Sequence, residues 1–457
     1  MSGGSAMVLS QLAELAGPSH VTNDPAEIAK YQIDGKSPAA VVRPASREEV
    51  AEIVKFAAAD KLAIVPTGAR TKLGIGMPPR KFDLALDMTR MDRIVAYDPG
   101  DLTLSVEPGI PLHKIAGTLA EHRQFLPLAV PFMDRATAGG TIASGVDSPL
   151  RQIYGTARDF VLGMEFVTGD GVAAKSGGRV VKNVAGYDMH KLMIGALGTL
   201  GVITKINFRT FPLPRAVRTC VATFRGPTAA CEFRHGIARS ALRPQSVEIL
   251  AAGAGCDPLL GRRAAVSFED DRWSVVVSFA GDEAVLDRTR RELQGLARGM
   301  NQNSLESFTE LRANPAENVN RYIADLPAAI LEHSPTAAIF KVSVLPMDLA
   351  DLAAGIQGIE MPWLAMMRGL GVTYLALLPP DRSEESLRVL KQECARIFSL
   401  SGKAPWGSSV LLWCPSELKR EINIWGAPSG DFALMQKLKS VFDPSGILSP
   451  GRFMGGL

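Results

Sequence analysis

The stretch ATAGGTIASG, residues 136–145, constrains the fold of this chain more than any other. It carries no charge and no aromatic ring, and nine of its ten residues are Ala, Gly, Ser or Thr. Such a stretch is either a flexible linker or a place where something bulky lies against the backbone. Because patterned strands and helices flank it, we predict a loop whose backbone a ligand approaches closely.

Two further glycine-rich loops lie in the same half of the chain. PTGARTKLGIG (66–76) directly follows the apolar strand KLAIVP (61–66), and GALGTLGVIT (195–204) comes later. Backbone N–H groups near Gly68 and Ala69 can converge on a phosphate, to which Arg70 and Lys72 add positive charge. Neither the P-loop pattern nor the GxGxxG fingerprint is present. Three such loops favour a long ligand such as a dinucleotide, and tight turns with close backbone packing remain the alternative.

The pattern of strands and helices changes near residue 215. Before it, short strands and helices alternate with glycine-rich turns, and Pro212 and Pro214 end the last strand of this region. After it, strand-like 273–281, 337–346 and 371–379 each precede a helical segment, at 283–299, 347–356 and 384–398. This rhythm predicts an α+β domain with an antiparallel, ferredoxin-like sheet. The predicted divisions are 1–34, 35–215, 216–405 and 406–457, and we find no repeat of fixed period.

Composition excludes several classes of protein. The 457 residues include 50 Lys+Arg and 47 Asp+Glu, so no basic surface for nucleic acid is expected. No apolar run approaches the ~18 residues of a membrane span. The five cysteines form no CxxC and the six histidines never fall at ligand spacing, so we expect no metal and no iron–sulfur cluster. We expect a cytoplasmic protein, either free or held at the inner membrane through partners.

Six motifs in fixed order resemble the vanillyl-alcohol oxidase/p-cresol methylhydroxylase flavoprotein family. They are PTGARTKLG, LDMTRMDRIVAYDPGDLTLSVEPGIPL, ATAGGTIASG, RDFVLGMEFVTGDG, VVKNVAGYDMHKLMIGALGTLGVIT and FDPSGILSPGRF. RDFVLG and KNVAGYDMHKLMIG are most similar to FAD-binding subunits of bacterial glycolate oxidase. The resemblance covers about residues 35–215 and 420–455 well. It implies an N-terminal helical segment, a two-lobed FAD-binding domain, an α+β cap domain that faces substrate, and a C-terminal helical tail that returns to the FAD domain.

The resemblance also implies where FAD lies. Residues 66–72 would wrap the pyrophosphate, 137–143 would let the backbone approach pyrophosphate and flavin, and 201–203 would contact the adenosine end. Arg452 would approach the isoalloxazine ring, where a cation stabilises the anionic reduced flavin. The implied cofactor residues are Pro66, Thr67, Gly68, Ala69, Arg70, Thr71, Lys72, Thr137, Gly139, Gly140, Ala143, Gly201, Val202, Ile203 and Arg452.

The chain departs from its family in two ways that affect chemistry. It lacks both the HxGDGN-like motif with which many relatives hold a metal against a hydroxy acid and the serine hydroxyl often found within residues 195–198. No clear flavin-attachment His or Cys is matched, so we expect noncovalent FAD. The catalytic residues stay open, with Lys182, Tyr187 and His190 as weak candidates set against a purely structural role.

The resemblance therefore predicts an FAD-dependent oxidoreductase subunit that acts on the CH–OH group of a small 2-hydroxy acid. Its expected partners are a second flavin subunit and an iron–sulfur subunit of a glycolate oxidase complex. Two alternatives remain: a stand-alone FAD oxidase or dehydrogenase for another alcohol, sugar or hydroxy acid, and a non-catalytic flavin-binding subunit that serves assembly.

Overall fold

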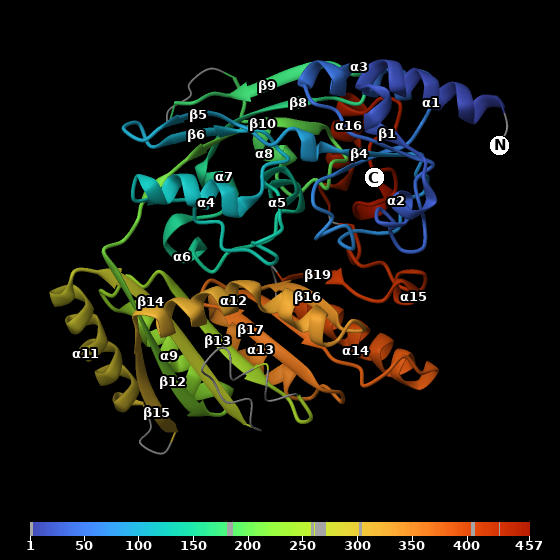
Figure 1. Cartoon of the computed structure of the whole chain (residues 1–457). Helices are drawn as coiled ribbons and strands as arrows, with labels where there is room; N and C mark the ends of the chain where they lie inside the picture. The colour runs from blue at the N-terminus through green and yellow to red at the C-terminus, as the bar shows by residue number, and fades with distance from the viewer. Residues whose placement is uncertain are drawn as a thin grey trace.

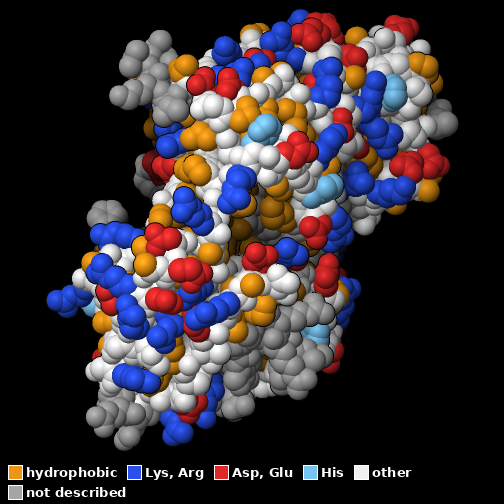
Figure 2. Space-filling view, turned by 60° about the vertical axis from the view of Figure 1, so that its left-hand side comes forward, with side chains coloured by type: hydrophobic (Ala, Val, Ile, Leu, Met, Phe, Trp, Pro, Cys, Tyr) orange, Lys and Arg blue, Asp and Glu red, His pale blue; other side chains and the backbone are white. Residues whose placement is uncertain are grey.

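The computed structural model describes residues 3–180, 186–256, 260, 271–300, 304–403, 407–428 and 430–457. Two small α/β lobes form the upper part of the molecule in Figure 1, and a large sheet with its helices forms the lower part. Both chain ends lie in the upper part, so the C-terminal segment returns to where the chain began. Hydrophobic side chains gather in a hollow between the two parts (Figure 2).

The first lobe is built on a four-stranded sheet of order β1-β2-β4-β3, in which β2, β4 and β3 run parallel. Helix α3 begins after Ser46, whose hydroxyl accepts the Glu49 N–H at 3.1 Å. The Glu49 carboxylate accepts the N–H of Ala45 at 2.8 Å, one residue before the position that a capping box uses. The elements are α1 (Gly3–Ala16), β1 (Val21–Thr22), α2 (Pro25–Ala29), β2 (Ala40–Val42), α3 (Arg47–Ala59), β3 (Ile64–Thr67) and β4 (Leu84–Asp87).

The second lobe is a five-stranded antiparallel sheet of order β5-β6-β10-β8-β9. Strands β8 and β9 pair as an antiparallel hairpin. The strands are β5 (Ile94–Asp98), β6 (Thr103–Val106), β8 (Val161–Val167), β9 (Ala173–Gly177) and β10 (Val202–Arg209), and a small separate sheet pairs β7 (Gln124–Phe125) with β11 (Phe211–Pro212). The helices are α4 (Leu112–Glu121), α5 (Ala138–Ser144), α6 (Arg151–Tyr154), α7 (Ala157–Phe160) and α8 (His190–Met193).

The small-residue stretch is a helix, so its prediction as a loop was wrong. Helix α5 occupies most of it, and the Thr137 hydroxyl accepts the Gly140 N–H at 3.4 Å. A Cβ on Gly139 would stand 2.6 Å from the Cβ of Pro108, closer than two such atoms can approach. The small residues thus let a short helix pack directly against the β6–α4 connection, which the sequence pattern did not reveal.

The lower part is an antiparallel eight-stranded sheet, the cap sheet, of order β15-β12-β14-β13-β17-β18-β16-β19. Numbered along the chain, its two halves have the orders 4-1-3-2 and 2-3-1-4, so each half is a ferredoxin-like βαββαβ unit. The two units join edge to edge through β13 and β17. They repeat each other in structure, although the sequence shows no repeat of fixed period. The strands are β12 (Ala216–Arg225), β13 (Ser246–Ala252), β14 (Arg272–Gly281), β15 (Leu305–Arg312), β16 (Ala338–Ser343), β17 (Trp363–Arg368), β18 (Val372–Leu377) and β19 (Ser408–Trp413).

The two faces of the cap sheet pack against different neighbours. The outer face contacts α9 (Pro227–Arg239), α11 (Glu283–Gly299), α13 (Leu349–Ile356) and α14 (Glu384–Lys403) through one hydrophobic cluster. The inner face packs against α12 (Ala313–His333) and against Ile75 and Val146 of the upper part. Helix α12 therefore lies at the junction of the two parts (Figure 1), where Asp325 accepts the Phe132 N–H at 2.7 Å.

The C-terminal segment completes the first lobe, as expected of a returning tail. After α15 (Ser416–Lys419) and α16 (Phe432–Phe442), residues 447–449 pair alongside β3, with an Ile64 N–H to Ile447 carbonyl bond of 2.8 Å. The Met77 N–H donates to the Arg452 carbonyl at 3.0 Å. This pairing sets Arg452 beside the 66–76 loop. Among the described helices, none is long and apolar enough to cross a membrane.

Candidate functional site

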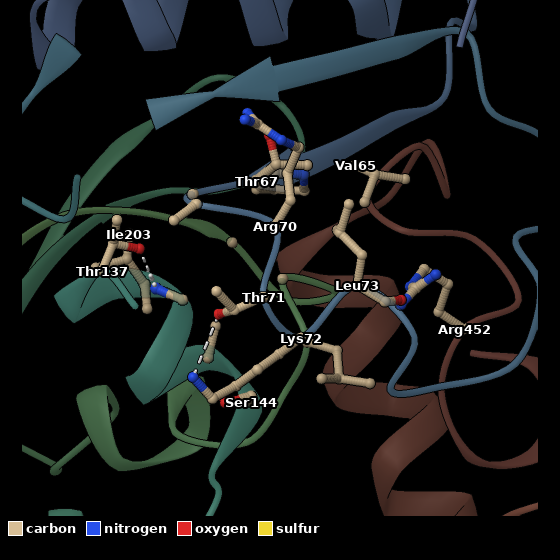
Figure 3. A pocket seen from close by; sticks show the side chains of 18 residues that line it. Val65, Thr67, Arg70, Thr71, Lys72, Leu73, Thr137, Ser144, Ile203 and Arg452 are labelled. Atoms are coloured by element: carbon tan, nitrogen blue, oxygen red, sulfur yellow. Dashed lines mark hydrogen bonds between the residues drawn. The ribbon is translucent and has the colours of Figure 1, made fainter. Parts of the chain in front are cut away.

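A cavity of about 650 Å³ opens between the two lobes, beside a smaller one of about 330 Å³ with which it shares walls. The end of β3 and the loop after it, helix α5, the start of β10 and the returning tail supply these walls (Figure 3). The structure brings every residue of the implied cofactor set to one or both cavities. Further lining residues that the sequence analysis did not name are Val65, Leu73, Met88, Pro108, Ser144, Leu197 and Gly198.

Gly68 is required where the 66–76 loop crosses α5. A Cβ at this position would stand 2.2 Å from the Thr137 Oγ1 and 3.2 Å from its Cβ. Thr137 already caps α5, so it cannot move away without losing that hydrogen bond. The loop and the helix are therefore held in contact, and their backbone atoms form a narrow floor of the cavity.

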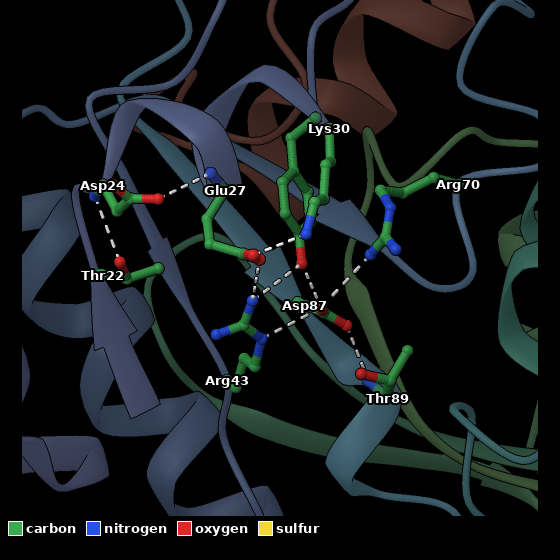
Figure 4. A network of polar contacts seen from close by, with 9 residues as sticks. Thr22, Asp24, Glu27, Lys30, Arg43, Arg70, Asp87 and Thr89 are labelled. Carbon is green, nitrogen blue, oxygen red and sulfur yellow. Dashed lines mark hydrogen bonds and ion pairs between the residues drawn. The ribbon is translucent and has the colours of Figure 1, made fainter. Parts of the chain in front are cut away.

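Arg70 is tethered to β4 and points away from Lys72 (Figure 3). It has a left-handed φ of 63°, its guanidinium lies 3.6 Å from Asp87 and it stacks 4.6 Å above the Tyr31 ring (Figure 4). Asp87 is 2% exposed, and it also pairs with Arg43 and accepts the Tyr31 hydroxyl. This network stabilises the unfavourable backbone conformation of Arg70. Because Asp87 balances much of the Arg70 charge, only part of that charge acts on the cavity. Asp87 could have been noticed in the sequence, because it is an acidic residue at the end of an apolar strand.

Lys72 extends across the cavity toward Ser144 (Figure 3). It is 9% exposed, and among the described residues its ammonium group makes one long contact, of 3.5 Å with Thr71 Oγ1, and lies 5.8 Å from the centre of the Phe132 ring. Burial lowers the pKa of Lys72 to about 8, a shift that the charge of Asp325 partly opposes. A buried amine without a carboxylate partner is costly, and an anion in the cavity would offset that cost.

Arg452 is 3% exposed at the other end of the cavity. Its Nη2 donates to the carbonyls of Leu73, at 2.7 Å, and of Ile75. Its Nη1 has no hydrogen-bond partner within the described part of the chain. Burial lowers the pKa of Arg452 to about 10. An unpaired, buried donor that lines a cavity is the chemistry expected of a residue that binds an acceptor on a ligand.

Two of the three catalytic candidates, His190 and Tyr187, do not line these cavities. His190 is 2% exposed and bonded through Nδ1 to Ser176 Oγ at 3.1 Å, and burial lowers its pKa, so its role is to pack α8 against β9. Tyr187 is 88% exposed and its side chain faces solvent. Neither contributes to the lining of the cavities, and a catalytic role for them stays a prediction. Lys182 lies outside the described residues.

The lining of the larger cavity fits an anionic cofactor. Among the described residues that form it, Arg70, Lys72 and Arg452 are cationic and none is acidic. The glycines leave backbone accessible, and Arg452 offers an unsatisfied donor. No group of three or more His, Cys, Asp or Glu among the described residues could hold a metal ion. The arrangement suits a phosphate-bearing ligand held by backbone and by cations.

Comparison with known families agrees with this geometry. Residues 38–177 match the FAD binding domain, and residues 213–360 and 426–453 match the C-terminal domain of FAD linked oxidases. The two models match separate parts of the chain. The chain is an FAD-dependent oxidoreductase, and its cofactor is FAD.

Curated relatives extend the likeness over the whole chain. Glycolate oxidase subunit GlcD of Bacillus subtilis is 24% identical over 97% of this chain and 96% of that protein. D-2-hydroxyglutarate dehydrogenase of Xanthomonas citri pv. viticola is 26% identical over 94% of this chain and 93% of that protein. Glycolate oxidase subunit GlcE of Escherichia coli is 41% identical, over 36% of this chain and 47% of that protein.

Solved structures share the fold. The substrate-bound p-cresol methylhydroxylase covers 99% of this chain with a TM-score of 0.76 at 16% identity, and 97% of that chain is matched. The 4-ethylphenol oxidase of Gulosibacter chungangensis covers 99% with a TM-score of 0.73 at 17% identity, again with 97% of that chain matched. The predicted two-lobed FAD-binding fold with its antiparallel cap is thereby confirmed.

Lys72 should make FAD binding depend on pH. Its ammonium is charged below a pKa of about 8 in the FAD-free protein, and bound phosphates would favour that charged form. We therefore expect FAD affinity to be full below pH 8 and to fall as the pH rises from about 8 to about 10. Fluorescence titration of the apoprotein with FAD measures this dependence, which Lys72→Met should remove while lowering affinity at neutral pH.

The matched control is Lys55→Met. Lys55 is exposed on α3 and paired with Glu52, away from the cavity, so this variant should keep the wild-type pH profile. If Lys72→Met lost affinity at neutral pH but kept the wild-type slope in the alkaline range, the amine would not be the titrating group.

Proposed function

We propose that this chain is the FAD-binding subunit of a glycolate (D-2-hydroxy acid) oxidase or dehydrogenase complex. The observation that carries the proposal is the convergence of three glycine-rich segments and Arg452 on one cationic cavity. Support also comes from GlcD, a glycolate oxidase subunit by name, which matches the chain over nearly its whole length. The dehydrogenase from Xanthomonas citri is named for another D-2-hydroxy acid, which supports the wider substrate class.

Each part of the cavity has a proposed task. The backbone of residues 66–72 and the ammonium of Lys72 hold the pyrophosphate, and Gly139 and Gly140 admit the cofactor close to α5. Arg452 Nη1 donates to the isoalloxazine ring, and residues 201–203 hold the adenosine end. FAD, when bound, takes the electron pair released as the CH–OH carbon becomes a carbonyl. We propose that FAD is noncovalent, since the described lining of both cavities includes no His or Cys.

The proposed partners are a second flavin subunit and an iron–sulfur subunit, with the complex in the cytoplasm or held peripherally at the inner membrane. In support, GlcD and GlcE are both named as subunits. Four of the five cysteines are buried, and burial raises the pKa of Cys220 to about 12. Such thiols are poor cluster ligands, so electrons would leave this flavin through a separate protein.

We further propose that residues 35–215 form the FAD-binding domain, 216–405 the substrate-facing cap and 406–457 a segment that packs on the FAD domain, after an N-terminal helical segment at 1–34. The two family matches are compatible with this division. A stand-alone D-2-hydroxy acid dehydrogenase is the second candidate, because the relative from Xanthomonas citri is named without reference to subunits.

An anaerobic visible spectrum of the purified chain, before and after glycolate, tests the proposal. We expect flavin bands that bleach when glycolate or another D-2-hydroxy acid is added. Bands that bleach only after the partner subunits are supplied would support the complex over the stand-alone enzyme. Bands that persist with every 2-hydroxy acid, alone and with partners, would contradict both.

A further inference from the structure

A second group of cavities lies where the upper part meets the cap sheet. One of about 1360 Å³ is lined by the Ser144–Val146 connection, the 194–196 turn, β16, β19 and the C-terminal segment. Another of about 660 Å³ adjoins it, and both are lined by Gly145, Val146, Arg158, Ile194 and Lys341. Ser144 lines the larger one and also the cofactor cavity. A ligand here would therefore lie next to the cofactor.

Lys341 is the charged side chain that the cap sheet directs into this junction. It alternates along β16 with Phe340 and Val342, which pack in the outer cluster, so Lys341 faces the upper part. Its neighbours across the sheet are Tyr374 on β18 and Val410 on β19. The larger cavity is mostly apolar, whereas the smaller one also has polar lining residues such as Asp147 and Ser148. Burial lowers the pKa of Lys341, an effect that Asp147 opposes.

The acids near Lys341 are already committed to other cations. Asp147 pairs with Arg151 at 3.1 Å and lies 3.7 Å from Arg368. Glu248 pairs with Arg368 at 3.4 Å. Two carboxylates thus balance two guanidinium groups, and the described structure gives Lys341 no carboxylate within 4.0 Å.

Arg158 supplies a second positive charge at the more exposed side of the same cavities. Its Nη2 donates to the Ile194 carbonyl at 2.8 Å, which fixes the side chain but leaves its charge unbalanced. Lys191 and Lys439, which also line the larger cavity, have the carboxylate partners Asp188 and Asp443. Within the described lining, the uncompensated charge is therefore concentrated at Arg158 and Lys341.

We propose that Lys341, assisted by Arg158, binds the carboxylate of the substrate in the cavity between the cap sheet and the FAD-binding lobes. The inference rests on the proposed function, because it takes the substrate to be a 2-hydroxy acid. A carboxylate balances the partly buried ammonium, and the apolar side chains of the larger cavity limit the water that would weaken the pair. Held there, the acid presents its neighbouring carbon toward the cofactor cavity beyond Ser144.

Oxalate is the probe, because it has the carboxylate but no CH–OH group to oxidise. We expect oxalate to bind the FAD-loaded wild-type chain in calorimetry, and Lys341→Met to weaken binding at least tenfold with FAD content unchanged. Because the replacement removes a partly buried charge without a carboxylate partner and keeps an unbranched side chain, it should fold, and its melting temperature without oxalate should equal or exceed that of wild type. Lys55→Met, which removes an exposed lysine outside the lining of these cavities, is the matched control and should bind oxalate as wild type does.

The outcomes separate this inference from the proposed function. If glycolate bleaches the flavin and Lys341→Met changes neither oxalate affinity nor the half-saturating glycolate concentration, the inference fails and the function stands. If no 2-hydroxy acid reduces the flavin but oxalate binds in a Lys341-dependent way, the carboxylate site stands and the function fails. Wild-type protein that does not bind oxalate overturns the inference directly.

Discussion

Gly140→Leu should abolish FAD binding and leave the protein folded. Gly140 lines both cavities of the cofactor site, and a Cβ there would meet only the Thr137 hydroxyl, at 3.1 Å. The added side chain must therefore extend into the space where we propose FAD lies. We expect the purified variant to be colourless, with FAD affinity lowered by more than a hundredfold in fluorescence titration.

The fold should tolerate this change because α5 is a helix. Leucine is about 1 kcal/mol better than glycine in a helix interior, which offsets a small shift of Thr137. Gly139→Leu should behave differently, since its Cβ would stand 2.6 Å from the Pro108 Cβ and 3.0 Å from the Pro108 carbonyl oxygen. That variant should be unfolded or insoluble. The pair separates loss of cofactor from loss of structure.

Gly117→Leu is the control for the chemical change itself. Gly117 lies in the middle of α4, and a Cβ added to it would have nothing within 4 Å, so its variant should bind FAD as wild type does. A Gly140→Leu protein that retained stoichiometric FAD would refute the proposed path of the cofactor. Such a result would mean that the small residues at 136–145 serve only the packing of α5.

The residues that line the two cavities between the lobes could be predicted from the sequence, because the residue preferences of tight turns are local. Gly68 and Gly140 are readable as positions where a side chain is not tolerated, and their neighbours in sequence are also their neighbours in the cavity. What the sequence could not supply is the partner of each glycine. Gly139 faces Pro108 and Gly68 faces Thr137, contacts that depend on how the lobes pack. For this reason the pattern of residues 136–145 indicates close backbone approach correctly but does not distinguish a packed helix from a loop.

Elements of the cap were harder to predict, because their signals conflict. Helix α12 carries Pro327 in its interior and begins at Ala313 with a left-handed φ of 50°, and both features argue locally against a helix. Its apolar stripe against the inner face of the cap sheet overrides them. Lys341 was easier to notice, because it is the single charged residue within the apolar strand IFKVSV. The acids that could have balanced its charge are far away in sequence, and they pair with other cations.

Lys419→Met should be among the most destabilising single substitutions in this protein. Lys419 is 1% exposed at its side chain, and its ammonium donates to Asp34 at 2.9 Å and to the Gly74 carbonyl at 2.6 Å. It thereby connects α15 with the N-terminal segment and with the 66–76 loop. Removing it leaves the nearly buried carboxylate of Asp34 without its cation and takes a donor from the Gly74 carbonyl, at a cost of about 3–5 kcal/mol.

Thermal unfolding and hydrogen exchange measure the effect together. We expect the melting temperature to fall by several degrees, and the amides of residues 73–76 to exchange faster even below the transition, since Gly74 loses its anchor. The added replacement Asp34→Asn should recover part of the loss, because the uncompensated charge is then gone while one hydrogen-bonding group remains.

Lys391→Met gives the contrast that makes the result interpretable. Lys391 pairs with Glu421, but both side chains are about half exposed, at 48% and 56%. Exposed pairs contribute at most about 1 kcal/mol, so this variant should melt close to wild type. Equal melting temperatures for the two variants would mean that water reaches Asp34 once Lys419 is removed. The C-terminal segment would then be held to the cofactor loop by its pairing with β3 and by Arg452, and not by the buried ion pair.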